Sequence, residues 1–139
     1  MLGVLLLASC GLSSAQSAAN QAVNVASWIT KYGMLDVKTL QSDFQGSANA
    51  LDAGNTKEAK AQCTKLASDT ASMDRQPLPQ SNPLAKDWAT TVSDSHVFAN
   101  ECLTAISTRS AAAISKAKDS GTKVTDDINA VSNDVGKLA

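Results

Sequence analysis

The sequence predicts an all-α protein: an antiparallel bundle of four or five helices in which one helical hairpin is joined by a disulfide. Apolar residues recur every three or four positions from about residue 17 onward, and no segment shows the alternation typical of a strand. Glycine or proline separates the apolar runs, which indicates several helices joined by turns. Cys63 and Cys102 lie on the apolar stripes of two successive predicted helices.

Length and charge narrow the classes of protein to consider. A chain of 139 residues allows one domain. The net charge of −1, without any Lys/Arg-rich run, excludes nucleic-acid binding through overall electrostatic attraction. Four stretches are expected: an export signal with a lipobox region at 1–15, a tether and first helix at 16–35, the helical bundle at 36–120, and a C-terminal amphipathic helix at 121–139 that is expected to fray.

The N-terminus is typical of an export signal. Residues 1–30 carry no charge, and the apolar run 2–8 is too short to span a bilayer. Leu7-Ala8-Ser9-Cys10 resembles the lipobox of bacterial lipoproteins, whose cysteine is acylated and becomes the first residue of the mature chain. This resemblance implies a lipid anchor on Cys10 and a location on the outer face of the cytoplasmic membrane or in the cell envelope. The polar stretch 11–21 suits a tether.

Two alternatives to lipidation remain open. Ser13-Ser14-Ala15 before Gln16 resembles the small-x-small site of ordinary signal peptidase, which would release a freely secreted chain. The second alternative is a buried N-terminal helix with a core cysteine. The odd number of cysteines favours lipidation, because an anchor on Cys10 leaves an even pair for an oxidising compartment.

The first helix is predicted over about 17–32, with Gly33 as its stop signal. Trp28, Ile29 and Tyr32 lie on neighbouring turns of this helix. They are expected either to pack in the core or to form an exposed aromatic cluster that contacts a partner protein or a membrane surface. We therefore name them as a candidate partner contact.

The second helix is predicted over 36–53 and the third from Asn55 or Thr56 to about Arg75. Asp36 is the expected N-cap of the second, and Gly54 is its expected C′ residue. The apolar stripe of the second helix is Val37, Leu40, Phe44, Ala48 and Leu51. The inner line of the third is Ala59, Cys63, Leu66, Thr70 and Met73.

A proline-bearing loop at 77–83 separates the third helix from the fourth. The fourth helix is predicted to begin at Asn82 or Pro83 and to continue through 110–118 to Gly121. Its stripe is Leu84, Trp88, Val92, Ser95, Ala99, Cys102 and Ile106. A last helix over 122–138 has the stripe Val124, Ile128, Val131, Val135 and Leu138, whose narrow spacing suits packing on another helix.

Cys63 and Cys102 should both point inward, because both lie on apolar stripes. Their helices flank the proline loop and should form an antiparallel hairpin. A disulfide would close a loop of roughly 40 residues and stabilise the fold by about 4 kcal/mol. The two cysteines lie at unequal distances from the loop, a stagger of about 10 Å that a loop running along the helix axis can absorb. The alternative is two small buried apolar residues; a catalytic or metal-binding pair is the least favoured interpretation.

A wider pattern covers residues 37–102. It consists of Val37-x-x-Leu40-x-x-Asp43, Leu51-Asp52-Ala53-Gly54-Asn55, Ala59-x-x-x-Cys63-x-x-Leu66-x-x-Asp69, Leu78-Pro79, Pro83, Trp88 and Cys102. This pattern resembles an uncharacterised family of small exported actinobacterial proteins, alanine-rich helical hairpins with one cysteine per helix. The resemblance implies the same hairpin and transfers no activity. Gly54-Asn55 stands where those proteins usually have Gly-Asp, and both sequences can start a helix.

The residues that could carry chemistry are few. His96 is the single histidine, so a multi-ligand zinc site is not expected, and we interpret it as a surface residue. Asp126 and Asp127 are interpreted as favourable charges at a helix N-terminus. The sequence has no phosphate-binding glycine loop, G-x-S-x-G motif or calcium loop. We expect no cofactor and no metal.

These observations predict a non-enzymatic cell-envelope lipoprotein that acts as a protein–protein interaction or accessory module, with an unknown envelope protein as partner. The alternative is a freely secreted or anchored helical bundle that binds a lipid or another small apolar ligand. A closed core with an exposed apolar surface would favour the first function, and excess internal volume would favour the second.

Overall fold

The computed structural model describes residues 24–138, and the regular elements in this range are helices. They are α2 (Val25–Trp28), a π-helical turn η1 (Ile29–Gly33), α3 (Met34–Asp52), α4 (Thr56–Met73), α5 (Asn82–Thr108) and α6 (Ala111–Leu138). The prediction of an all-helical protein is confirmed for this part of the chain. Cys10 and the predicted export signal lie outside the described residues.

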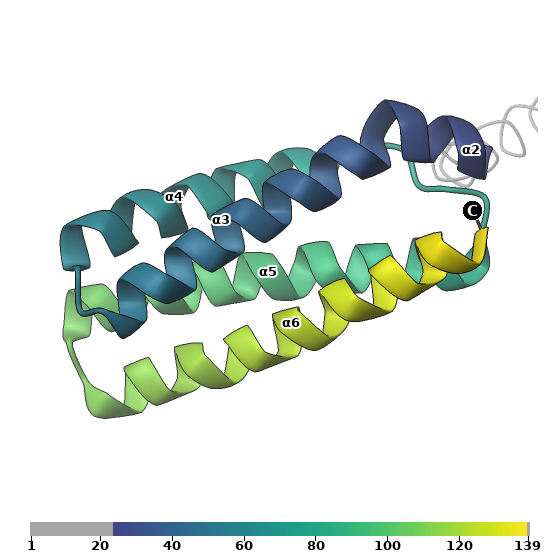
Figure 1. The fold of residues 1–139 in the computed structure, drawn as a ribbon. Coiled ribbons are helices and arrows are strands. Elements are labelled where there is room, and N and C mark those ends of the chain that lie inside the picture. The colour runs from purple at the N-terminus through teal and green to yellow at the C-terminus, as the bar shows by residue number, and fades with distance from the viewer. Residues whose placement is uncertain (1–23, 139) are drawn as a thin grey trace, which may run out of the picture.

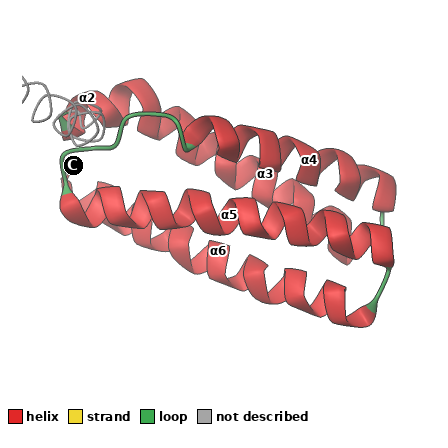
Figure 2. Cartoon of the chain, turned by 180° about the vertical axis from the view of Figure 1, so that it is seen from behind, coloured by secondary structure: helices red, strands yellow, loops and turns green. Residues whose placement is uncertain are grey.

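The four long helices lie side by side, and the segments that connect them lie at alternate ends of the molecule (Figure 1). Two connections are short, at 53–55 and 109–110, whereas 74–81 is longer and runs along the end of the molecule between α4 and α5 (Figure 2). Three pairs of neighbours pack closely: α3 with α4, α4 with α5, and α5 with α6. Helices α3 and α6 touch at few positions.

The sequence predicts that the first helix ends at Gly33, but the helix continues through this residue. The backbone is right-handed helical at Trp28, at Gly33 and at Met34, so α2, η1 and α3 form one continuous helix with a wide turn in it. Glycine is required at position 33 because the Trp28 ring lies against the backbone. A Cβ atom on residue 33 would stand 2.5 Å from Cζ3 of Trp28. Asp36, the predicted N-cap, consequently lies inside the helix and is buried.

The boundary between α3 and α4 follows the sequence signals. Gly54 adopts φ of +70°, the left-handed conformation expected of a C′ glycine. The side-chain oxygen of Asn55 then accepts a hydrogen bond of 3.1 Å from the Glu58 backbone N–H, which caps α4. These two residues turn the chain within three positions.

The boundary between α5 and α6 differs from the prediction. Helix α5 ends at Thr108 because Arg109 adopts φ of 54°, and Ser110 Oγ accepts a hydrogen bond from the Ala113 N–H at the start of α6. The fourth helix therefore does not run to Gly121, and the expected division at 120/121 falls within α6. Gly121 is buried inside α6, where a Cβ atom would stand 3.3 Å from the Phe98 ring.

The core joins all four long helices and confirms most of the predicted stripes. Two edge-to-face aromatic pairs mark it, Trp28 with Trp88 at one end and Phe44 with Phe98 further along. The other buried members of this cluster are Leu40, Leu66, Met73, Leu84, Val92, Ala99, Val124, Ile128 and Val131. Helix α6 therefore packs on the bundle over most of its length, and Leu138 at its end is exposed.

Candidate binding groove between α3 and α6

The predicted partner contact at the first helix requires correction at Trp28. Trp28 is fully buried and its indole Nε1–H donates a 2.9 Å hydrogen bond to the Pro77 carbonyl, so it fastens the first helix to the proline loop. Ile29 and Tyr32 are half-buried against the core. Trp28 cannot contact a partner in this position, because the bundle already covers its whole ring.

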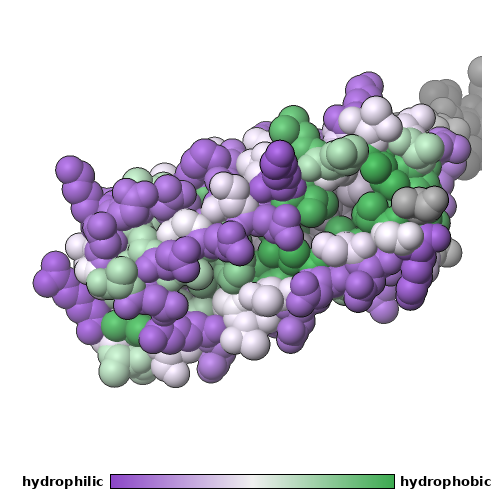
Figure 3. All heavy atoms as spheres, in the orientation of Figure 1, coloured by the Kyte–Doolittle hydropathy of each residue, from purple (hydrophilic) through white to green (hydrophobic). Residues whose placement is uncertain are grey.

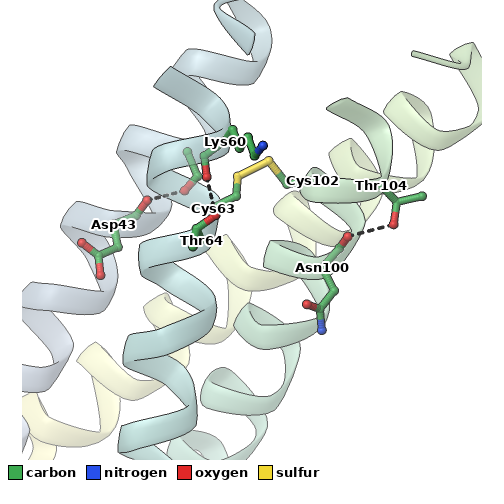
Figure 4. The surroundings of a disulfide bond; sticks show 8 residues. Asp43, Lys60, Cys63, Thr64, Asn100, Cys102 and Thr104 are labelled. Atoms are coloured by element: carbon green, nitrogen blue, oxygen red, sulfur yellow. Dashed lines mark hydrogen bonds between the residues drawn. A yellow bond between two sulfur atoms is a disulfide. The ribbon is translucent and has the colours of Figure 1, made fainter. Parts of the chain in front are cut away.

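The two predicted cysteines meet. The Sγ atoms of Cys63 and Cys102 lie 2.03 Å apart, and the Cα atoms lie 6.3 Å apart, both within the range of a disulfide. Both residues are fully buried between α4 and α5 (Figure 4). The loop 74–81 runs along the molecule before α5 begins, which absorbs the expected stagger (Figure 2).

Three hollows lie in a row along the line where α3 and α6 diverge, and together we call them the α3/α6 groove. The near hollow, of about 280 Å³, lies beside α2 and is lined by residues that include Ile29, Met34, Val37, Lys38, Gln41, Val131 and Val135. The middle hollow, of about 140 Å³, is lined by Gln41, Phe44, Gln45, Thr125, Ile128 and Asn129. The far hollow, of about 460 Å³, is lined by residues that include Phe44, Ala48, Leu51, Phe98 and Gly121.

The floor of the groove is apolar, and its rims are polar, with charged side chains at Lys38 near one end and at Asp52 and Lys118 at the other. Phe44 lines both the middle and the far hollow, and Phe98 reaches the far hollow from α5. Gln45 on α3 and Thr125 on α6 are exposed along the two rims. Figure 3 shows hydrophobic surface gathered between α3 and α6, most extensively toward the end where α2 lies. An apolar strip with such rims is a surface suited to binding.

One ion pair spans the groove at its far end. Lys118 Nζ on α6 lies 3.7 Å from Asp52 Oδ1 on α3. Both side chains are more than half exposed, so this pair contributes little to stability. The pair therefore does little to hold α3 and α6 together at the groove.

His96 is half-buried between α4 and α5, not on the open surface as predicted. Its Nδ1 lies 2.9 Å from the Thr70 hydroxyl oxygen, and that hydroxyl donates to the Leu66 carbonyl. The contact joins α4 to α5 through either tautomer of the ring.

Two pairs of acidic residues and one glutamate–serine pair form a ladder between α5 and α6, which we call the acidic ladder. Its three steps, seven residues apart on each helix, are Asp87 with Asp134, Asp94 with Asp127, and Glu101 with Ser120. Burial, together with the neighbouring Asp94 carboxyl, raises the pKa of Asp127 to about 7. The Asp87 carboxyl, together with burial, also raises the pKa of Asp134.

The sequence carries a signal for this ladder in the spacing of its acidic residues. Asp87, Asp94 and Glu101 share one line of α5 at heptad spacing, as do Ser120, Asp127 and Asp134 on α6. Asp127 was interpreted as a charge that favours a helix N-terminus. The structure places it in the middle of α6, facing another carboxyl.

Within residues 24–138, no three His, Cys, Asp or Glu side chains are grouped so as to hold a metal ion. In the same range, no helix combines the length and the apolar character that crossing a membrane requires. No known protein family, curated protein or solved structure matches the chain.

Proposed function

We propose that the protein is an exported, lipid-anchored and non-enzymatic envelope module whose α3/α6 groove binds an amphipathic helix of a partner protein. The observation that supports this proposal is the groove itself, where two neighbouring long helices leave an apolar strip open to solvent. The core beneath it is closed around Phe44 and Phe98, which favours a surface contact over an internal ligand.

The shape of the groove suits a helix as ligand. A helix laid in a groove presents apolar residues at positions i, i+3 or i+4, and i+7, so it needs successive hollows along one line. The middle and far hollows supply two, and both include Phe44 in their lining. The uncharged rims at Gln45 and Thr125 suit the polar flanks of such a helix.

Support for the anchor comes from the cysteines and from the N-terminal sequence. With Cys63 and Cys102 at bonding distance, Cys10 is the remaining cysteine. It follows the apolar run 2–8 in a lipobox-like setting, and the pattern over 37–102 resembles a family of exported proteins. Acylation by two or more chains would hold the protein stably at a membrane.

The bundle that the anchor carries is, in this proposal, antiparallel. The acidic ladder supports that arrangement, because residue numbers rise along α5 as those of their partners fall along α6. The connections at alternate ends of the molecule agree with it (Figure 1). Consecutive helices joined by short turns normally pack in this way.

A photoreactive amino acid placed on the groove rim tests the function in host cells. At Gln45 and at Thr125 it should cross-link the same protein partner, whereas at Ser68, exposed on α4, it should not. Equal cross-linking at all three positions would contradict the proposal.

The same experiment distinguishes the alternative function, a freely secreted or anchored bundle that binds a lipid or a small apolar ligand. The near hollow favours this alternative, because it is apolar and approaches the size of small-ligand sites. A groove-specific adduct of small mass, in place of a protein, would support the ligand-binding function.

A further inference from the structure

Exposed apolar side chains gather at one end of the described structure. Among its large apolar residues, Met34 is 69% exposed, Leu35 is 67% exposed and Leu138 is 46% exposed. Met34 and Leu35 begin α3 directly after α2 and η1, and Leu138 ends α6, whose C-terminus lies at the same end of the molecule (Figure 1). Val97, on α5, is also exposed but lies away from this group. We call the first three residues and their surroundings the α2-end surface.

The exposed charges that α2, the start of α3 and the end of α6 give to the α2-end surface are all positive, and the loop 74–81 beside them adds one exposed acid, Asp74, and one exposed base, Arg75. Over 25–38 and 128–138, the exposed charged side chains are those of Lys31, Lys38 and Lys137. The two acids in these segments turn inward, because Asp36 is buried and Asp134 pairs with Asp87 on α5. Apolar side chains ringed by lysines are typical of surfaces that lie on anionic bilayers.

We propose that the α2-end surface docks on the anionic face of a lipid bilayer, with Met34, Leu35 and Leu138 among the headgroups and the three lysines at the lipid phosphates. This inference rests on the proposed membrane location. The chain enters the described structure at Asn24, at this same end, so an anchor on Cys10 and the docking surface would face one membrane. Anchor and surface would together set the orientation of the bundle.

Charge argues against a second copy of the chain as occupant. A two-fold contact between α2-end surfaces would bring the three lysines of one copy against the three of the other. Such a contact brings like charges together, whereas a bilayer rich in anionic lipid supplies the opposite charge. The lysine stems can also lie along apolar surface while their ammonium groups reach the phosphates.

Vesicle sedimentation tests the docking without the anchor. The full chain carrying Cys10→Ser is mixed with vesicles of phosphatidylcholine alone or with phosphatidylglycerol added. We expect tighter binding to the anionic vesicles, weakened by salt. Replacing Lys31, Lys38 and Lys137 together by Gln should weaken binding by about fivefold per lysine.

The apolar part of the surface is tested with a matched control. Met34→Ser with Leu35→Ser should weaken binding to the anionic vesicles at least about tenfold, whereas Val97→Ser, on another face, should leave it unchanged. All the variants should unfold at the temperature of the parent, because these side chains are exposed. Binding that ignores both sets of substitutions would overturn the docking. The docking would also be overturned if the parent forms a dimer that the double substitution Met34→Ser and Leu35→Ser dissociates, while vesicle binding stays the same.

The test separates the docking from the anchor. It uses a chain that cannot be acylated, and the apolar run 2–8 is identical in the parent and in every variant, so the difference in binding between parent and variant reports on the surface. Lipidation without surface-dependent vesicle binding would leave the proposed function standing and reject the docking. If the host does not acylate the chain, the anchor is rejected. The docking still stands in that case if vesicle binding depends on the surface residues.

Discussion

The Trp28 ring occupies the space beside residue 33, and this contact explains the helix geometry at the first turn of the bundle. Gly33→Ala should lower the free energy of unfolding by about 1–3 kcal/mol, because its Cβ would stand 2.5 Å from Cζ3 of a ring that is fully buried. Gly136→Ala in α6 is the matched control, since no atom lies within 4 Å of its Cβ. It should raise stability by up to about 1 kcal/mol. Urea denaturation of both variants measures this, and equal effects would contradict the account of Gly33.

Glycines illustrate what the sequence could and could not predict. Gly54 was predicted correctly, because a helix cap, Asn55, follows it directly and strengthens the turn signal. Gly33 and Gly121 gave the same local signal but serve close packing, against Trp28 and Phe98. The true break at Arg109 had no signal, since arginine seldom adopts a positive φ.

At the scale of elements, the contact of α5 with α6 depends on pH through the acidic ladder. Folding raises the pKa of Asp127 to about 7, from an ordinary value of 3.8. Between these values the folded chain binds more protons than the unfolded chain. The stability from this group is therefore fully present below about pH 4 and is lost as the pH rises to about 7.

Asp127→Asn should remove this dependence, because the amide stays neutral. The variant should match the parent near pH 4 and exceed its stability above pH 7. Asp119→Asn, exposed on the same helix, serves as the control and should follow the parent throughout. Thermal unfolding at several pH values measures the difference. A variant less stable than the parent at pH 8 would contradict the ladder.

The link between α4 and α5 should dominate stability. Reduction opens a loop that spans 39 residues, so it should lower the free energy of unfolding by about 4 kcal/mol. The double variant Cys63→Ala with Cys102→Ala should be equally destabilised and insensitive to reductant. Denaturant unfolding with and without reductant tests this. If reductant leaves the stability of the parent chain unchanged, the two cysteines are not joined by a disulfide.

The elements themselves were largely predictable, whereas the contacts between them were not. The apolar stripe through Leu40 and Phe44 predicted which face of the helix is buried, because residues three or four positions apart lie on the same face of a helix. The divergence of α3 from α6 was not visible, since it depends on how four helices pack together. The groove could not be predicted for the same reason, because Phe44 and Phe98 in its floor come from helices far apart in the sequence.

At the scale of the whole molecule, we propose an anchored bundle with two binding surfaces. The α2-end surface would face the bilayer, and the Phe44 floor of the α3/α6 groove would stay open to a partner along the length of the bundle. The disulfide would keep α4 and α5 together beneath this groove in an oxidising compartment. The two surfaces meet at the near hollow, where Met34 and Lys38 belong to both, whereas Gln45 and Thr125 belong to the groove alone.

Anchoring through Cys10 is tested most directly by the intact mass of the protein purified from the membrane fraction of its host, before and after reduction. We predict an acylated chain that begins at Cys10 and gains two hydrogens on reduction, as one disulfide requires. A soluble chain that begins at Gln16, or an unprocessed chain with three thiols, would contradict the lipid-anchored account.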